Sequence, residues 1–446
     1  MWFRRDLRLG DNPALLDACA GGPDGVLPLF VVDPALWEPA GPSRRAYLSR
    51  SLAALDSSLD GGRLSVAHGE PVREVVRAAR DVGAGRVHVA ADYGPHGHHR
   101  DLDVERALAD AGVELVRTGS PYAVAPDRVR NGSGKPYQVF TPFYRAWLEH
   151  GWRDPVDPPT GVTWLDSRGS GALPEAGPPD GLELPEAGER AATRRWTTYV
   201  EEELGDYADE RDRPDLDSTS RMSVHLKWGE IHPRTMLAGL ARRRGEGPAA
   251  YRRELAFREF YADVLFRRPD TAREYLRPEL AGMEYDEPGP RLHAWEQGRT
   301  GYPVVDAGMR QLRALGWMHN RVRMIVASFL VKDLHVEWQH GARHFMHWLV
   351  DGDLASNMQG WQWVAGSGTD PAPYFRVFNP VAQGRRFDPD GAYIRRWVPE
   401  LAGLEGAYVH EPWTHPDGPP HGYPEPIVDH GRERAEALAR YERVRS

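Results

Sequence analysis

Short apolar runs alternate with segments of helical periodicity over the first 120 residues of the chain. The runs predict buried strands, and the segments between them predict helices. The expected strands are Val26–Val32, Leu64–Ala67, Arg86–Ala91 and Val113–Arg117, and the expected helices are Asn12–Ala20, Ser43–Leu59, Val72–Val82 and Leu102–Ala111. This alternation predicts an α/β domain built on a doubly wound parallel sheet, with helices on both faces.

The first strand is expected to be short. Only Met1, Trp2 and Phe3 precede the first turn, whereas strands usually run about 5–6 residues. Either this strand is stunted or the natural chain begins earlier.

A second pattern follows a stretch that is poor in regular structure. Residues 151–185 hold seven prolines and six glycines, which interrupt helices and strands. Beyond this stretch, apolar residues recur at helical spacing in Glu254–Phe266, Val304–Leu315, Asn320–Leu334 and Ala342–Leu349. Because 446 residues are too many for one core, we expect an α/β domain at 1–125, a linker at 126–185 and an all-α domain at 186–446.

Composition narrows the class of protein. Hydrophobic residues make up 41% and charged residues 27%, as in ordinary globular proteins. The single cysteine, Cys19, excludes an internal disulfide and fits a reducing compartment. The N-terminal MWFRRDLRLG lacks the apolar run of a signal peptide, and no apolar run reaches the length of a membrane span. We therefore expect a cytoplasmic protein without a membrane segment.

Charge is distributed unevenly. The net charge of -9 argues against bulk attraction to nucleic acid. Residues 221–273 nevertheless hold 12 Lys and Arg against 6 Asp and Glu. This stretch is either a solvated helical face or part of a surface for a polyanion.

Three polar clusters are candidates for chemistry. Thr219–Ser223 combines three hydroxyls with a guanidinium, which suits a phosphate cradle or a plain helix N-cap. Asp351-Gly352-Asp353 needs a donor or cation between its carboxylates, for which Arg323 is a candidate, or else caps a helix. The histidines of Asp92–Arg100 lack a fixed frame of further ligands, so we expect no metal site.

The stretch from Arg299 to Trp363 is dense in Trp, Arg, Asp and Asn, which indicates a cavity lined by both aromatic and polar groups. Its blocks TGYPVVDAGMRQL and NRVRMIVASFLVKDLHVEW closely resemble signature blocks of class I DNA photolyases, in the cryptochrome/photolyase family. The resemblance extends from Trp2 to about His430. It implies an antenna-binding α/β domain, a helical FAD-binding domain and light-dependent repair of UV-damaged DNA.

The resemblance assigns residues by position. Those implied to bind FAD are Tyr207, Thr219, Ser220, Arg221, Met222, Ser223, Arg258, Asn320, Arg323, Asp351, Gly352, Asp353 and Asn357. Those implied to bind DNA are Arg211, Glu254, Phe257, Arg258, Tyr261, Asn320, Arg321, Met324, Trp363 and Arg376. Those implied in the chemistry are Glu254, Asn357, Trp338, Trp361 and Tyr285.

Several of these positions carry specific expectations. Glu254 would donate to a pyrimidine carbonyl, or else form an i,i+4 pair with Arg258. Asn357 would face flavin N5, where its neutral amide favours the anionic reduced flavin. Trp361 and Trp338 would form an electron-transfer chain. Tyr285 stands where the family has a third Trp, which predicts slower photoreduction. An acidic residue lies on either side of Tyr285 in the sequence, Glu284 before it and Asp286 after it.

Three departures bear on the substrate and the antenna. Phe257 stands where relatives place a Trp platform, which predicts weaker lesion binding with chemistry retained. The histidines typical of enzymes for (6-4) photoproducts are absent at Asn320 and Met324, which favours cyclobutane dimers. The segment DYGPHGHHR departs from the Asn-Glu pair of methenyltetrahydrofolate-binding relatives and favours an 8-hydroxy-deazaflavin antenna.

The expected activity is therefore that of a carbon–carbon lyase. Photoexcited reduced FAD would pass an electron to a cyclobutane pyrimidine dimer in single- or double-stranded DNA, and the ring would split. A monomer is expected. The alternative is a cryptochrome-like blue-light sensor that binds FAD without efficient repair.

Overall fold

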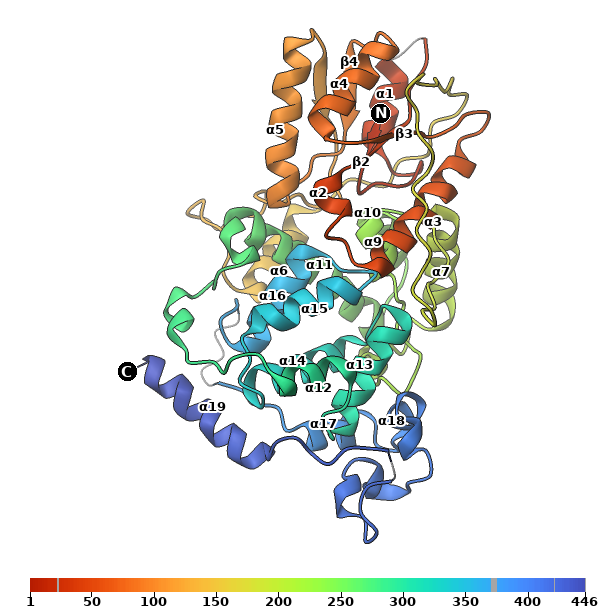
Figure 1. Ribbon diagram of the computed structural model, residues 1–446. Coiled ribbons are helices and arrows are strands. Elements are labelled where there is room, and N and C mark those ends of the chain that lie inside the picture. Colours follow the sequence, from red (N-terminus) through yellow and green to blue (C-terminus); the bar gives the residue numbers. More distant parts are fainter. Residues whose placement is uncertain (22–23, 370–374, 421, 446) are drawn as a thin grey trace.

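The computed structural model describes residues 1–21, 24–369, 375–420 and 422–445. An α/β domain stands at the top of Figure 1, and a larger helical domain lies below it. The described residues form five strands: β1 (Trp2–Phe3), β2 (Leu29–Val32), β3 (Ser65–His68), β4 (Arg86–Val89) and β5 (Glu114–Arg117). Hydrogen bonds join them in two parallel groups, β1-β2-β3 and β4-β5, and β4 lies next to β1.

Helices cover both faces of these strands, as expected for a doubly wound arrangement. Trp2 and Val31 pack on one face with α4 (Pro71–Asp81) and α5 (Pro95–Asp110). Phe3 and Phe30 pack on the other face with α1 (Pro13–Gly21) and α3 (Pro42–Ser58). The period-2 alternation along β1 and β2 therefore produces two separate cores. A short helix, α2 (Pro34–Trp37), follows β2.

Element boundaries differ from the sequence prediction by a few residues. The first strand has only two residues, as expected. The strand predicted at Val26–Val32 is confined to its last four residues. The helix predicted at Leu102–Ala111 begins seven residues earlier, at Pro95, because proline is well suited to the first helical position.

The predicted linker contains one helix. α6 (Phe140–His150) lies inside 126–185, and its Trp147 is fully buried, donating a hydrogen bond from Nε1 to Glu259 Oε2 at 2.6 Å. Residues 151–188 follow without a helix or strand. They lie along the α/β domain, where Trp164 bridges to Val26 and Gly171 to Val66. The connecting segment is therefore packed against the domain that precedes it.

The remaining helices form the second domain. They are α7 (Glu189–Glu202), α8 (Tyr207–Glu210), α9 (Ser223–Trp228), α10 (Pro233–Ala241), α11 (Glu246–Arg267), α12 (Pro290–Gln297), α13 (Pro303–Leu315), α14 (Asn320–Lys332), α15 (Trp338–Trp348), α16 (Leu354–Ala365), α17 (Pro380–Phe387), α18 (Ala392–Trp397) and α19 (His430–Arg445). Short 3-10 helices occur at Pro269–Ala272 (η1), Pro278–Gly282 (η2), Pro399–Leu401 (η3), Gly406–Val409 (η4) and Pro412–Thr414 (η5).

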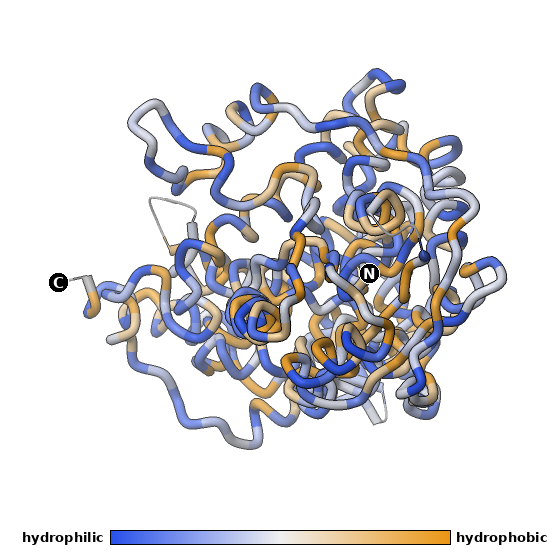
Figure 2. Tube along the Cα trace, turned by 90° about the horizontal axis from the view of Figure 1, so that it is seen from above, coloured by the Kyte–Doolittle hydropathy of each residue, from blue (hydrophilic) through white to orange (hydrophobic). Residues whose placement is uncertain are grey.

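Two apolar cores hold this domain together. One is formed mainly by α13, α14, α15 and α16, and the other by α6, α7, α10 and α11. α11 contacts α16, so the two cores adjoin there. Seen from above in Figure 2, hydrophobic segments gather toward the middle and hydrophilic loops lie at the rim.

Three predicted helices in this domain have different ends. The helix predicted at Glu254–Phe266 starts eight residues earlier, at Glu246. The one predicted at Asn320–Leu334 ends at Lys332, since His335 has a left-handed φ of 52° that stops the helix. The one predicted at Ala342–Leu349 begins at Trp338. Within the described ranges, no helix has the length and apolar character needed to cross a membrane.

Candidate functional site

The pair predicted between Arg323 and Asp351 is present. Arg323 Nη2 donates to Asp351 Oδ2 at 2.8 Å, and Arg323 Nε donates to the carbonyl of Met318 at 2.8 Å. Asp351 is buried, and its other oxygen, Oδ1, has no hydrogen-bond partner among the described residues. An unpaired buried acceptor costs about 1–3 kcal/mol. Asp351 therefore offers a ligand a fixed acceptor that the protein leaves unsatisfied.

Asp353 has a different role from Asp351. Its Oδ1 caps α16 by accepting from the Ser356 backbone N–H at 3.0 Å, as the capping alternative predicted. Its Oδ2 pairs with Arg5 of the α/β domain at 2.7 Å. Burial acts to raise the pKa of Asp353, but Arg5 and Lys227 outweigh it and hold that pKa below its usual value. Asp353 therefore fixes the start of α16 and ties the two domains together.

The loop at Thr219–Ser223 is held by several polar contacts. Ser220 Oγ lies 2.7 Å from the Tyr251 hydroxyl, and Arg195 donates to the carbonyls of Thr219 and Ser220 at 3.1 Å each. Arg221 has a left-handed φ of 54°. The N-cap of α9 is Met222, without a side-chain cap, so the plain N-cap explanation is wrong. The loop leads into the start of α9, where backbone N–H groups suit an anion.

Aromatic rings and a hydroxyl lie beside this loop. Tyr207 is buried against Tyr251, with ring centroids 5.0 Å apart. Arg221 pairs with Asp217 at 2.6 Å and lies over the Trp317 ring. Ser218 Oγ, just before the loop, is buried without a partner in the described part of the chain. Like Asp351 Oδ1, this hydroxyl suits a polar ligand.

Glu254 lies in an ion pair, but with another partner than the sequence suggested. Arg211 Nη1 is 2.7 Å from Glu254 Oε1, and both side chains are about one-third exposed. The alternative i,i+4 pair with Arg258 is not formed. Arg258 instead donates to the carbonyl of Pro121 at 3.1 Å and lies over the Tyr122 ring. Arg258 therefore braces α11 against the segment that follows the α/β domain.

The first turn of α14 presents further predicted residues. Asn320 is exposed, and its amide nitrogen lies 3.9 Å from the Met324 sulfur. Arg321 pairs with Asp212 at 2.6 Å and lies over the Phe387 ring. The structure thus places the predicted lesion contacts Asn320 and Met324 side by side, one turn from Arg323.

α16 contacts α11, α14 and α15 and carries three predicted residues. Asn357 Nδ2 donates to the carbonyl of Ala342 at 3.1 Å, which fixes its amide. Trp363 is partly buried against the core of α13–α16. Trp361 is buried, with its ring 5.0 Å from Phe345 and 6.2 Å from Trp295. The helix thus joins the expected flavin, lesion and electron-transfer positions.

The remaining members of the expected electron-transfer chain are Trp338, at the start of α15, and Tyr285, in the segment before α12. Trp338 is fully buried, and its ring is 6.0 Å from that of Tyr275. Tyr285 is partly buried against the same core, and burial raises its pKa to about 12. Sequence reasoning missed Tyr275. Its only signal was the spacing of ten residues before Tyr285, in a segment without regular periodicity.

Phe257 and Tyr261 occupy one side of α11. The Phe257 ring is 6.0 Å from that of Tyr261 and stacks on Phe140 of α6. Phe140 was not predicted, because it lies 117 positions earlier in the sequence.

Gly352 has little room for a side chain, since an added Cβ would lie 3.0 Å from Arg44 Nη1. Arg376 is exposed beside the buried Phe375.

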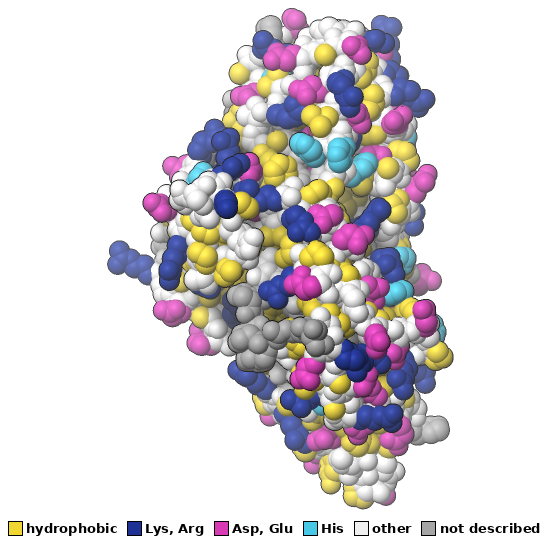
Figure 3. All heavy atoms as spheres, turned by 90° about the vertical axis from the view of Figure 1, so that its left-hand side faces the viewer, with side chains coloured by type: hydrophobic (Ala, Val, Ile, Leu, Met, Phe, Trp, Pro, Cys, Tyr) yellow, Lys and Arg dark blue, Asp and Glu magenta, His cyan; other side chains and the backbone are white. Residues whose placement is uncertain are grey.

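Ion pairs engage part of the basic stretch at 221–273. Arg234 pairs with Asp11, Arg267 with Asp127 and Asp263, and Arg268 with Asp270. On the face shown in Figure 3, Lys and Arg side chains are interspersed with Asp and Glu. On that face, therefore, the two signs of charge are mixed and do not form a continuous basic surface.

The histidines of Asp92–Arg100 diverge. His96 Nε2 is 2.9 Å from Asp33 Oδ2, whereas the His98 ring packs 5.9 Å from that of Phe266. Among the described residues, no group of three or more His, Cys, Asp or Glu is arranged to hold a metal ion.

Burial lowers the pKa of Lys227 to about 7, and Arg5 contributes to this shift.

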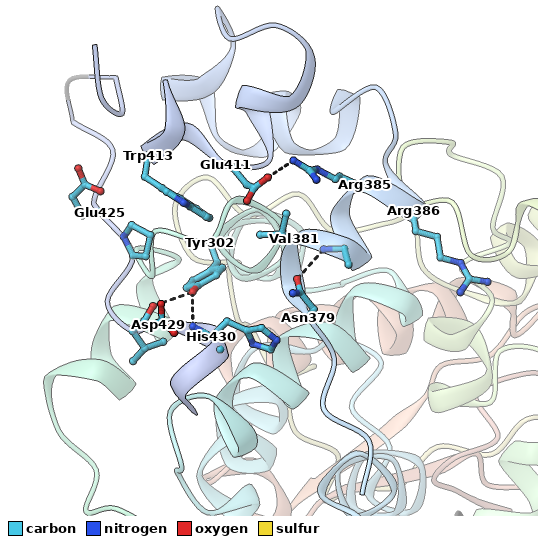
Figure 4. Close-up of a pocket in the computed structure, with 14 residues that line it drawn as sticks. Tyr302, Asn379, Val381, Arg385, Arg386, Glu411, Trp413, Glu425, Asp429 and His430 are labelled. Atoms are coloured by element: carbon cyan, nitrogen blue, oxygen red, sulfur yellow. Dashed lines mark hydrogen bonds and ion pairs between the residues drawn. The ribbon is translucent and has the colours of Figure 1, made fainter. Parts of the chain in front are cut away.

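An open pocket elsewhere on the helical domain is built from different residues (Figure 4). It lies among α17, the start of α19 and the segment before α19. Tyr302 lies in its wall near Trp413, and Arg385 pairs with Glu411 at its edge. None of the residues assigned by resemblance lines this pocket.

Comparison with known proteins gives concordant matches to both domains. Residues 1–160 match the family model described as DNA photolyase, and residues 251–443 match the FAD binding domain of DNA photolyase. A deoxyribodipyrimidine photo-lyase of Streptomyces griseus is 44% identical, with 99% of this chain and 98% of that protein covered.

Two solved structures extend this likeness to the fold. A bacterial class III photolyase from Agrobacterium tumefaciens superposes with a TM-score of 0.93 at 38% identity, covering 100% of this chain and 97% of the other. An archaeal photolyase from Sulfolobus tokodaii, whose structure contains two FAD molecules, gives a TM-score of 0.86 at 30% identity, with 99% of each chain covered.

Proposed function

Because the chain belongs to the DNA photolyase family, we propose that it repairs UV-damaged DNA in light by splitting cyclobutane pyrimidine dimers. The observation that carries this proposal is that α16, which bears Asn357, contacts both α11, which bears Glu254, and α14, which bears Asn320, while Arg323 of α14 holds Asp351 just before α16. Relatives named deoxyribodipyrimidine photo-lyase match this chain over nearly its whole length.

The residues present fit FAD. Asp351 Oδ1 and Ser218 Oγ are buried without partners among the described residues, and the loop at Thr219–Ser223 presents hydroxyls and backbone N–H groups suited to a pyrophosphate. Arg323 holds Asp351 in place. When bound in its reduced form, FAD supplies the light absorption and the electron that the reaction needs.

The protein's own groups position the lesion. Glu254, held by Arg211, would meet a polar edge of a flipped-out base, while Phe257 and Trp363 offer aromatic surfaces. Asn320 and Met324 would contact the lesion. The flanking phosphates or the rim of the cavity would be served by Arg211, Arg258, Arg321 and Arg376, with Tyr261 as a further DNA contact. Arg211 and Arg321 are already paired with Glu254 and Asp212, so DNA phosphates must compete with these carboxylates.

Photoreduction would use Trp361 and Trp338 as electron carriers and Tyr285 at the end of the chain. Asn357, with its amide fixed by the Ala342 carbonyl, would present a neutral group to flavin N5. These roles come from the family resemblance and are supported by the burial of both Trp rings.

Within the family, we propose the class I assignment on the two signature blocks. The class III photolyase of Agrobacterium tumefaciens superposes closely on this chain, so class III is the competing assignment. We also infer a cytoplasmic monomer, on the single cysteine and on the activity proposed.

For the antenna we propose 8-hydroxy-deazaflavin. The segment DYGPHGHHR favours it. The photolyase from Sulfolobus tokodaii contains a second FAD, so a second flavin is the competing outcome. Mass spectrometry of the chromophores released from protein purified from its own host distinguishes deazaflavin, folate and a second FAD.

The lesion is tested by offering the photoreduced, FAD-loaded chain two oligonucleotides in light. One carries a cyclobutane thymine dimer and the other a (6-4) photoproduct. We expect restoration of the first only. A photoreduced, FAD-loaded protein that restores neither would favour the blue-light sensor, and restoration of the second would contradict the assignment of Asn320 and Met324.

A further inference from the structure

Tyr285 lies beneath α19, away from the carboxylates that flank it in sequence. Asp286 pairs with Arg440 at 2.8 Å, and Glu284 pairs with Arg443 at 3.1 Å. Tyr285 itself packs with Met283 and other apolar side chains against α19. Both neighbouring acids are thus engaged by arginines of α19.

The hydroxyl of Tyr285 points to another partner. It lies close to the hydroxyl of Tyr275, which is only 5% exposed, and each of the two phenols shifts the pKa of the other. The Tyr275 hydroxyl donates to Glu337 Oε1 at 2.8 Å. A phenol carries one proton, so Tyr275, which donates to Glu337, can act toward Tyr285 only as an acceptor. The result is a directed chain from Tyr285 through Tyr275 to a carboxylate.

This chain ends beside Trp338. The Tyr275 ring meets the Trp338 ring edge to face, with centroids 6.0 Å apart and planes at 86°. Glu337 precedes Trp338 at the N-cap of α15, yet its side chain makes no capping hydrogen bond and accepts from Tyr275 instead. The backbone N–H of Asp286 donates to the His335 carbonyl at 2.8 Å, which holds the Tyr285 segment against the loop that carries Glu337.

We propose that Tyr275 is the group that reduces oxidised Trp338, with Glu337 as its proton acceptor and Tyr285 as the next donor. This proposal rests on the proposed photoreduction through Trp361 and Trp338. A Trp338 radical cation takes one electron from Tyr275, whose phenolic proton moves to Glu337. The products are neutral Trp338, a neutral Tyr275 radical and a protonated Glu337.

The radical then moves from Tyr275 to Tyr285, in a step that transfers one electron and one proton. Tyr285 gives Tyr275 its electron and its proton between the two neighbouring hydroxyls, which restores Tyr275 and leaves the radical on Tyr285. A small thiol returns a hydrogen atom to Tyr285, and Glu337 releases its proton to solvent. Burial raises the pKa of Tyr275 and of Tyr285, so neither phenol readily loses a proton by itself, and an adjacent acceptor is needed.

Flash photolysis of the FAD-loaded full-length chain tests the relay, with transient absorption and electron paramagnetic resonance to separate Trp from Tyr radicals. In Glu337→Gln both phenols remain, and we expect tyrosyl formation to slow by about 100-fold, the usual scale of a lost proton acceptor. In Tyr275→Phe no tyrosyl radical should form from Trp338. Deuterated solvent should slow the parent, but not Glu337→Gln.

Glu284→Gln is the matched control, since Glu284 lies next to Tyr285 but pairs with Arg443. It should leave tyrosyl formation unchanged. Unaltered kinetics in Glu337→Gln, or a tyrosyl radical at the parental rate in Tyr275→Phe, would overturn the relay while leaving the Trp chain intact. A parent that forms no Trp radical would contradict the proposed photoreduction, and the relay with it.

Discussion

Phe140 of α6 lies face to face with Phe257 of α11, with ring centroids 3.4 Å apart and planes inclined by 11°. Arg253 lies over the Phe140 ring at 5.4 Å and over Tyr144 at 5.1 Å. A Phe in place of Trp reduces the area on which a lesion can stack. The ring behind it, however, fixes the orientation of Phe257 before DNA binds, which lowers the cost of binding.

Replacing Phe140 should therefore weaken lesion binding without touching DNA directly. Phe140→Leu keeps an apolar group but removes an aromatic pair worth about 0.5–1.5 kcal/mol. We expect the Kd for dimer-containing DNA to rise by roughly two- to tenfold, measured by fluorescence anisotropy in the dark. Val139→Ala, at an exposed neighbouring position, should leave the Kd unchanged. Equal affinities of the parent and Phe140→Leu would contradict the role of Phe140.

Enlarging Phe257 tests the platform itself. Base–aromatic stacking is worth about 1–3 kcal/mol per base, so Phe257→Ala should weaken dimer binding by roughly that amount. Phe257→Trp should tighten binding by less, because the larger ring must still fit against Phe140. The same anisotropy titration, with undamaged DNA as the comparison, measures both. A Trp variant that binds the dimer no tighter than the parent would count against the area argument.

Arginines at the rim should set the salt dependence of binding. Each phosphate contact contributes a slope of about 0.9 in the logarithm of affinity against the logarithm of salt concentration. Arg376→Gln should reduce the slope by about that amount if Arg376 meets one phosphate. Arg321→Gln should reduce it by up to the same amount, since a phosphate must displace Asp212 from Arg321. Arg106→Gln, an exposed arginine of the α/β domain, is the control, and identical slopes in all variants would exclude these contacts.

The ion pair between Arg5 and Asp353 should make domain stability depend on pH. The pKa of Asp353 is lower in the folded protein than the usual value of about 3.9. A carboxyl with a depressed pKa contributes stability that is fully present above the unfolded value and is lost as pH falls through the folded value. Asp353→Asn keeps a good N-cap residue but removes the charge.

We therefore expect Asp353→Asn to be destabilised by about 1–3 kcal/mol near neutral pH, below the range for fully buried pairs because both side chains are partly exposed. The difference from the parent should shrink as pH falls below about 4. Denaturant titrations at several pH values, with flavin occupancy matched, measure it. Asp103→Asn, which breaks an exposed pair with Arg106, should show no such trend. A difference that stays constant with pH would exclude the ion pair as the cause.

Local patterns predicted the layers of the fold better than they predicted its contacts. The alternation of strands and helices was sufficient to predict the parallel α/β domain. The need of Asp351-Gly352-Asp353 for a cation was sufficient to name Arg323 as a candidate partner, and Arg323 pairs with Asp351. The Pro95 start of α5 could have been read from the sequence, since proline favours the first helical turn. The left-handed His335 that ends α14 had no signal of that kind.

The partners that were missed come from distant parts of the chain. Asp353 meets Arg5 across the domain boundary. Glu254 pairs with Arg211, which follows α8, and not with Arg258, which lies one helical turn from it on α11. Helical spacing shows which residues share a face, but it does not show which of several cations will reach a carboxylate. Tyr275 and Glu337 likewise meet only because a segment without regular structure folds back on α15.

Light-dependent splitting of cyclobutane pyrimidine dimers can be measured on a short duplex that carries one thymine dimer. The photoreduced, FAD-loaded protein is illuminated with this duplex, and restored thymines are counted against a dark control. We expect restoration in light and none in the dark, with a large loss of rate in Glu254→Ala. No restoration by protein shown to hold fully reduced FAD and to bind the duplex would contradict the proposed function.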